Sequence, residues 1–199
     1  MPVKLDIPNG QFAAYIFDLD GTLIDTMPLH YKAWDKAMRL AGLKTQLDED
    51  LFYSLGGVPT IRVAQLIAEH YNLTIDPIKV YHEKEKFFLE IHTQAQLIDE
   101  TVAFAKKVHK THPIAVASGG TKDVVFNSLQ SAGLKHMFEV IVCADDVTHG
   151  KPAPDMFLLA AKLLNVEPTQ CLVFEDAEPG IKAAYAAGMQ VVRVDSRIK

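Results

Sequence analysis

Two aspartates follow the first apolar segment of the chain, in the sequence Asp18-Leu-Asp-Gly-Thr-Leu23. A carboxylate at the end of a strand can attack phosphorus and form a covalent acyl phosphate. A second carboxylate two residues later can protonate the leaving oxygen and then deprotonate water. A calcium loop also begins Asp-x-Asp, but its glycine stands at the sixth place, whereas Gly21 stands at the fourth. We therefore predict that Asp18 is a nucleophile and Asp20 its acid/base partner, with two surface turn aspartates as the alternative.

A glycine turn follows the second apolar segment, at Ser118-Gly-Gly-Thr121. Glycines after a strand allow backbone N–H groups to approach a phosphate, and the next helix points its N-terminus to the same place. Taken alone, this turn also fits any ordinary strand-to-helix connection. Together with the aspartates, it predicts that Ser118, Gly119 and Gly120 contact a phosphoryl group.

Two further charged sites suit the same chemistry. Lys151 lies between a glycine and a proline, and Glu175 and Asp176 end the fourth apolar segment. Lys151 could be an ordinary surface lysine, but beside Asp18 its charge would offset those of the nucleophile and of a phosphate. Adjacent carboxylates without histidine or cysteine suit Mg²⁺, which binds through few carboxylates, water and the substrate phosphate.

These polar residues need a scaffold that brings them together. Short apolar segments alternate with amphipathic stretches, which predicts buried parallel strands of an α/β sheet at 12–17, 113–117, 140–144, 171–174 and 190–194. Amphipathic helices are predicted at 99–109, 121–131, 155–164 and 179–188. Ligands of such sheets bind at the carboxyl ends of the strands. The aspartates, the serine, the lysine and the acidic pair should therefore meet at one edge.

The pattern changes between residues 26 and 93, where only helical stretches occur, at 29–40, 61–70 and 78–91. We predict a small helical cap, residues 26–93, inserted after the first strand. The fold class is then α/β, with a Rossmann-like parallel-sheet core formed by residues 1–25 and 94–199.

Composition limits the partners. The formal net charge of −5 argues against nucleic-acid binding, and no apolar stretch approaches the roughly 20 residues of a membrane span. The N-terminal residues lack the apolar segment of a signal peptide, and the two cysteines, Cys143 and Cys171, fit reduced buried thiols. We expect a cytoplasmic enzyme that binds a small-molecule phosphate ester, with no nucleic-acid or membrane partner. No clear association helix is present, so we expect a monomer.

The ordered motifs resemble those of the haloacid dehalogenase superfamily over essentially the whole chain. They are Asp18-x-Asp20-Gly-Thr, Ser118, Lys151 in Gly-Lys-Pro-x-Pro-Asp, and Glu175-Asp176. The resemblance implies a nucleophile and Mg²⁺ ligand at Asp18, an acid/base at Asp20 whose backbone carbonyl also binds Mg²⁺, and a metal ligand at Asp176. It implies phosphate binding by Ser118 and Lys151, and metal support by Glu175, directly or through water.

The chain is similar to the β-phosphoglucomutase-like branch, and within it to bacterial fructose-1-phosphate/6-phosphogluconate phosphatases. The stretches Gly57-Val-Pro-Thr-Ile-Arg62 and Lys151-Pro-Ala-Pro-Asp-Met-Phe-Leu-Leu159 carry the latter likeness. This resemblance implies substrate contacts in the cap from His30, Trp34, Gly57 and Lys84. Core packing remains an alternative for His30 and Trp34, and a solvated helix face for Lys84.

Three activities compete. A phosphatase for small sugar phosphates is favoured over a phosphohexose mutase, and a dehalogenase is disfavoured because it needs neither metal nor a second acid such as Asp20. The mutases carry an arginine two residues after Gly-Val of the cap loop, where this chain has Thr60. Arg62 is two residues further along a helix, about 200° away in direction, so we do not expect it to replace that arginine.

Overall fold

The computed structural model describes residues 5–56 and 58–195. The chain divides into two compact units, Met1–Asp25 with Gln96–Lys199, and Thr26–Ala95. We call them the core unit and the cap unit and describe each by itself.

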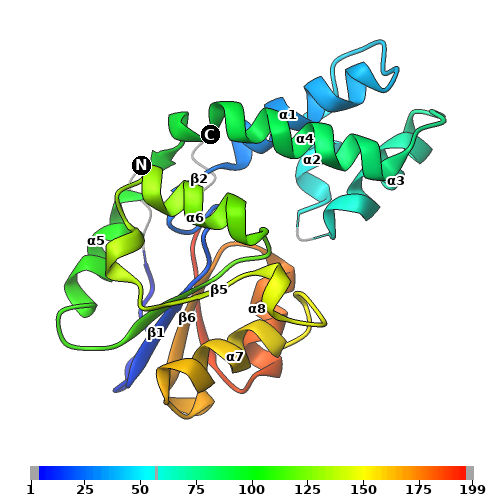
Figure 1. The fold of residues 1–199 in the computed structure, drawn as a ribbon. Coiled ribbons are helices and arrows are strands. Elements are labelled where there is room, and N and C mark those ends of the chain that lie inside the picture. Colours follow the sequence, from blue (N-terminus) through cyan, green and yellow to red (C-terminus); the bar gives the residue numbers. More distant parts are fainter. Residues whose placement is uncertain (1–4, 57, 196–199) are drawn as a thin grey trace. The chain divides into compact units, whose positions relative to one another are not determined.

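The core unit is built on a five-stranded parallel sheet in the order β5-β4-β1-β6-β7. The central strand β1 (Ala14–Phe17) lies between β4 (Ile114–Ala117) and β6 (Cys171–Glu175) (Figure 1). The outer strands are β5 (Val140–Val142) and β7 (Gln190–Arg193). The predicted parallel α/β sheet is therefore confirmed, with strand ends that differ by one or two residues from those expected.

Side chains of β1 alternate between two buried faces of the sheet, as the period of a strand requires. Ala14 and Ile16 join a hydrophobic cluster that includes Phe157 of α7 (Asp155–Leu164) and Ala183 of α8 (Glu178–Ala186). Tyr15 faces the other way, where its ring meets that of Phe104 in α5 (Asp99–Val108) at 5.5 Å. Figure 1 shows α5 and α7 on opposite sides of the sheet. Burial on both faces explains why β1 is almost wholly apolar.

The other elements of the core unit are short. Helix α6 spans Lys122–Ser131. Three 3₁₀ turns precede or follow strands: η2 (Lys135–Met137), η3 (Ala144–Asp146) and η4 (Pro168–Gln170). The helices observed in place of those predicted at 99–109, 121–131 and 179–188 are each one residue shorter, the last of them beginning one residue earlier than predicted, and the helix predicted at 155–164 has the expected ends.

A two-stranded antiparallel ladder was not predicted. It joins β2 (Ile24–Asp25) to β3 (Gln96–Leu97), the segments where the chain leaves and re-enters the core unit. Two residues are too few to produce a hydrophobic period, so sequence patterning could not reveal this pairing.

The described residues of the cap unit form four α-helices, of which sequence patterning predicted three. These are α1 (Met27–Leu40), α3 (Thr60–His70) and α4 (Pro77–Ile91), and a 3₁₀ turn, η1 (His92–Gln94), follows the last. The missed helix, α2 (Glu49–Ser54), has only six residues and is capped by the Asp48 side chain, which accepts a hydrogen bond from the Leu51 N–H.

Two further sequence expectations can be compared with the described residues. Cys143 and Cys171 are buried free thiols, and burial raises the pKa of Cys143 to about 12 and that of Cys171 to about 11. Both thiols are therefore protonated near neutral pH and are poor nucleophiles. Within the described ranges, no helix has the length and apolar character needed to cross a bilayer.

Candidate active site

The carboxyl ends of three adjacent strands position the predicted catalytic side chains. Asp18 follows β1, and its N–H donates to the Phe174 carbonyl of β6 at 2.9 Å. Ser118 follows β4, and its N–H donates to the Val142 carbonyl of β5, also at 2.9 Å. The sheet hydrogen bonding thus continues through both residues, which holds their side chains at one edge of the sheet beside Glu175, the last residue of β6.

Lys151 joins two of the acids. Its Nζ donates to Oδ1 of Asp18 at 2.6 Å and to Oε1 of Glu175 at 2.7 Å. The Lys151 side chain is only 10% exposed, so the surface-lysine alternative is wrong. Burial by itself lowers the pKa of Lys151, but the charges of Asp18 and Glu175 outweigh it and raise that pKa above its ordinary value. The ammonium group is therefore permanently charged.

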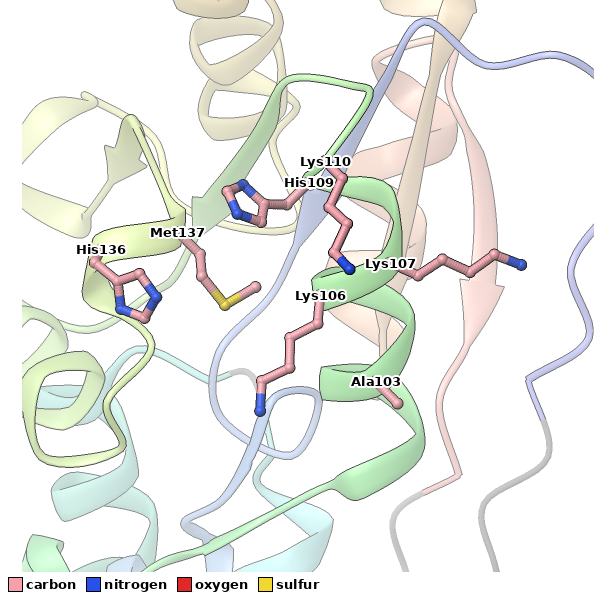
Figure 2. A pocket seen from close by; sticks show the side chains of 7 residues that line it. All are labelled: Ala103, Lys106, Lys107, His109, Lys110, His136 and Met137. Atoms are coloured by element: carbon pink, nitrogen blue, oxygen red, sulfur yellow. The ribbon is translucent and has the colours of Figure 1, made fainter.

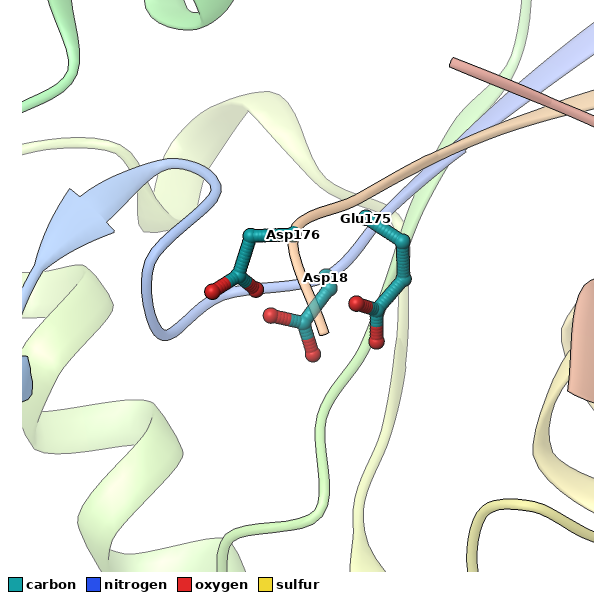
Figure 3. A group of neighbouring side chains, drawn as sticks. All are labelled: Asp18, Glu175 and Asp176. Atoms are coloured by element: carbon teal, nitrogen blue, oxygen red, sulfur yellow. The ribbon is translucent and has the colours of Figure 1, made fainter. Parts of the chain in front are cut away.

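Three carboxylates converge beside this ammonium group. Oxygen atoms of Asp18, Glu175 and Asp176 lie within 4.8 Å of one another (Figure 3). Burial raises the pKa of Asp18 well above its ordinary value, because Lys151 offsets only part of the effect of burial and of the neighbouring carboxylates. Burial, followed by the charge of Glu175, raises the pKa of Asp176 to about 7. The cluster therefore holds more negative charge than one ammonium group neutralises.

This donor set fits a magnesium ion. Its atoms are hard carboxylate oxygens, and burial together with neighbouring carboxylates raises the pKa values of Asp18 and Asp176, an effect that a divalent cation beside them would counteract. Both carboxylate oxygens of Glu175 already accept hydrogen bonds: Oε1 accepts from Lys151, and Oε2 accepts from the Ala177 N–H at 2.7 Å. Asp18 and Asp176 are thus the better-placed direct ligands.

Asp20 is hydrogen-bonded to the serine of the glycine turn. The Ser118 hydroxyl donates to Oδ2 of Asp20 at 3.4 Å, and the Gly120 N–H donates to the Ser118 Oγ at 3.1 Å. Gly119 is exposed, and an added Cβ there would meet nothing within 4 Å. The structure thus brings Asp20, Ser118 and the glycine turn together, and the charge of Asp20 contributes to the raised pKa values of Asp18 and Asp176.

Three positions that support the acids were not singled out from the sequence. Thr22 donates from Oγ1 to Oδ1 of Asp176 at 3.4 Å. Gly21 has a φ of +84°, and any Cβ there would collide with the Asp176 carboxylate. A Cβ at Gly180, in the first turn of α8, would collide with the Glu175 carboxylate. The first two positions belong to the Asp-Gly-Thr motif, which could have indicated them; the Gly180 contact depends on tertiary packing.

Gly180→Ala should therefore disturb the active site by displacing the Glu175 carboxylate. The new methyl group must displace the Glu175 side chain, which would loosen its contacts with Lys151 and the Ala177 N–H. We expect a loss of stability of about 1–3 kcal/mol, typical of overpacking, together with a fall in kcat. Gly150→Ala is the control, since a Cβ there meets nothing within 4 Å. Equal unfolding midpoints in urea for the two variants would contradict this expectation.

The cap unit gathers three of its four predicted substrate residues around Phe88. The His30 ring stacks on the Phe88 ring at 4.0 Å, and Lys84 Nζ lies 5.3 Å from the Phe88 ring and 5.9 Å from the Trp34 ring. Lys84 is 4% exposed and pairs with Glu85, so the solvated-face alternative for this lysine is wrong. Trp34 is buried as well. Gly57 lies outside the described residues.

The chain matches known proteins over most of its length. A family model described as haloacid dehalogenase-like hydrolase matches residues 12–188. The fructose-1-phosphate phosphatase YqaB of Escherichia coli K12 is 42% identical over 92% of this chain and 97% of its own. A phosphorylated carbohydrates phosphatase of Thermotoga maritima is 32% identical over 89% and 82%.

The fold has a matching solved structure. A β-phosphoglucomutase from Clostridium difficile superposes with a TM-score of 0.77 and 27% identity, and the match covers 95% of this chain and 94% of that one. The family match spans the predicted catalytic motifs, the Escherichia coli and Thermotoga maritima homologues are phosphatases, and the acids and lysine of those motifs converge at the carboxyl ends of the strands. The chain therefore belongs to the haloacid dehalogenase-like hydrolases and is a phosphatase.

Proposed function

We propose that this protein is a Mg²⁺-dependent phosphatase of small sugar phosphates that works through a phosphorylated Asp18. The observation that carries the proposal is the Lys151 ammonium group between Asp18 and Glu175, beside a cluster of three converging carboxylates. A buried nucleophile with a permanent cation against one oxygen and a metal-binding acid cluster beside it suits attack on a dianionic phosphate.

In the first step, a carboxylate oxygen of Asp18 attacks phosphorus while the bond from phosphorus to the sugar oxygen breaks. The leaving oxygen takes a proton from Asp20, which lies two residues along the same loop. Lys151 and the Ser118 hydroxyl bind phosphoryl oxygens, and the N–H groups of the glycine turn lie next to that hydroxyl. The products of this step are the free sugar and an acyl phosphate on Asp18.

In the second step, Asp20 is a carboxylate and accepts a proton from water, whose oxygen attacks phosphorus. The bond from phosphorus to Asp18 breaks, and inorganic phosphate leaves with the nucleophile restored. A bound Mg²⁺ would supply positive charge for the transferring phosphoryl group through both steps. On this chain, Asp18, Asp176 and the backbone carbonyl of Asp20 would hold it, with Glu175 fixing Lys151 and supporting the metal site.

Removal of divalent metal should abolish turnover. Excess chelator leaves the crowded acids without compensating charge, and added Mg²⁺ should restore full activity. Asp176→Ala should raise the Mg²⁺ concentration needed for half-maximal rate by at least about tenfold. Asp123→Ala, at an exposed aspartate of α6, is the control. Full activity in excess chelator would refute the metal assignment.

The cap unit and the homologues favour a sugar phosphate as substrate. Two proteins similar to this chain are named as phosphatases of fructose 1-phosphate and of phosphorylated carbohydrates. A cluster of one histidine, one lysine and aromatic rings in the cap unit offers few polar anchors, so the non-reacting part of the substrate contributes limited binding energy. We therefore expect several small sugar phosphates to be hydrolysed with modest discrimination.

A mutase is the second candidate, since a β-phosphoglucomutase shares the fold. A mutase must hold a sugar bisphosphate by its distal phosphate and keep water from the acyl phosphate. The arginine that the mutases use is replaced by Thr60, and Arg62 donates from Nη1 to Glu69 at 2.8 Å and to Gln65 at 3.2 Å on α3. Lys84 alone would give a distal phosphate one point charge instead of a bidentate partner.

Product analysis separates the two activities. With fructose 1-phosphate, 6-phosphogluconate and β-glucose 1-phosphate as substrates, we expect stoichiometric phosphate release. We expect no glucose 6-phosphate from β-glucose 1-phosphate, even when a sugar bisphosphate is added. Rapid formation of glucose 6-phosphate would favour the mutase, and activity confined to nucleotides or phosphoproteins would contradict the proposed substrate class.

A further inference from the structure

The core unit contains a second concave site, distinct from the acidic cluster. A cavity of about 520 Å³ lies where the last turn of α5 and the loop after it meet the 3₁₀ turn η2. Bases dominate its lining, which includes Lys106, Lys107, His109, Lys110 and His136. In Figure 2, Lys106, Lys110 and the two histidines surround the Met137 side chain, while the Lys107 ammonium group points away from them.

This cavity lies at the amino ends of strands β4 and β5, whereas the predicted catalytic residues lie at the carboxyl ends of the strands. Helix α5 ends at Val108, shortly before β4 begins at Ile114, and η2 ends shortly before β5 begins at Val140. Ser118, in contrast, follows the carboxyl end of β4. The strand of four residues between them is ~13 Å long. A ligand in this cavity would therefore not occupy the phosphoryl-transfer site.

The charge of the cavity is uncompensated within the described chain. None of its lysines or histidines has a carboxylate partner there, and no acidic residue lines it, although the whole chain has a net charge of −5. Lys106 and Lys107 complement the carbonyl end of α5. That role does not account for Lys110, His109 and His136, which lie beyond the helix. An anion bound among these bases would be attracted by their positive charge.

We propose that this cavity binds a small organic molecule that carries two phosphate-like groups. Lysine ammonium groups bind phosphate oxygens as point charges, and the cavity volume is in the range of small-ligand sites. The apolar residues of the lining are Ala103, which is exposed, and Met137, which is 4% exposed, and a carbon skeleton would contact them whereas inorganic phosphate alone would not. A single cavity on an acidic protein suits a small ligand better than a nucleic acid, which needs an extended row of bases.

The test uses hexamethylene bisphosphonate as a probe, because a phosphatase does not cleave its P–C bonds. Amide NMR of the full chain, titrated at constant ionic strength without divalent metal, should shift the signals of Ala103, Lys106, Lys110 and His136. We expect a Kd below about 1 mM and weaker binding of inorganic phosphate. Absence of shifts at these amides, or equal affinity for inorganic phosphate, would overturn the proposal.

Paired variants make the test specific. Lys106→Gln with Lys110→Gln should weaken probe binding at this cavity by at least about tenfold and leave phosphate-ester turnover unchanged. Lys44→Gln with Lys162→Gln removes the same charge from exposed lysines elsewhere and should change Kd by less than about twofold. Equal weakening by the two pairs would overturn the proposal, as would tighter binding of a single-stranded oligonucleotide at the same amides. Because the readout is binding at these amides, its failure leaves the proposed catalytic function intact.

Discussion

Asp18→Asn should lower kcat by at least about 10³-fold. The amide cannot form the acyl phosphate, so neither the formation of this intermediate nor its hydrolysis can take place. The fold should survive the change. Burial and the neighbouring carboxylates raise the pKa of Asp18, so a neutral amide is no costlier to bury at this position than the carboxylate. Lys151 keeps its contact with Glu175.

The measurement for this variant pairs steady-state kinetics with thermal unfolding. We expect Tm to be equal to or above that of the unmodified protein, so that the lost activity cannot be attributed to unfolding. Asp123→Asn, at an exposed aspartate, is the matched control and should keep full activity. A variant at position 18 that retained a tenth of the wild-type kcat would refute the nucleophile assignment.

Asp20→Asn should have an effect that depends on the leaving group. With a sugar phosphate, the alkoxide needs a proton, so we expect a loss in kcat of about 10²–10⁴-fold. With an aryl phosphate such as p-nitrophenyl phosphate, the leaving group needs no proton, so the first step should remain fast. The second step still needs a base for water and should become slow.

A burst of p-nitrophenol followed by a slow steady state is therefore the expected time course for Asp20→Asn. Ser118→Ala serves as the comparison, because it would remove the proposed hydroxyl contact with the phosphoryl group and should slow both classes of substrate alike. Equal losses for aryl and sugar phosphates in Asp20→Asn, without a burst, would show that Asp20 does not act on the leaving group.

The residues at the carboxyl ends of the strands could be predicted from the sequence because the patterns that indicate them are local. Apolar segments that end in Asp18, Ser118 and Glu175 define strand ends, and parallel strands place their ends together. The geometry adds what depends on distant contacts. Examples are the space that Gly180 leaves for Glu175 and the burial of Lys84 within a charged run. Periodicity reports which face of an element is apolar, but not which distant side chain packs against it.

The limits of patterning also explain the missed elements. Helix α2 has six residues and depends on a side-chain cap at Asp48, and the β2–β3 ladder has two residues in each strand. Segments this short are stabilised by their tertiary surroundings more than by intrinsic propensity. The same argument applies to the basic cavity, whose residues come from α5, the loop after it and η2 and appear ordinary in the sequence.

The most direct test of the account is to trap the phosphorylated residue. Asp20→Asn is mixed with p-nitrophenyl phosphate, quenched during the slow phase and treated with borohydride, which reduces an aspartyl phosphate to homoserine. Peptide mass spectrometry should then find homoserine at position 18 and aspartate at position 176. Homoserine at any other position, or unmodified Asp18 in an enzyme that has released a stoichiometric burst of p-nitrophenol, would contradict the covalent mechanism.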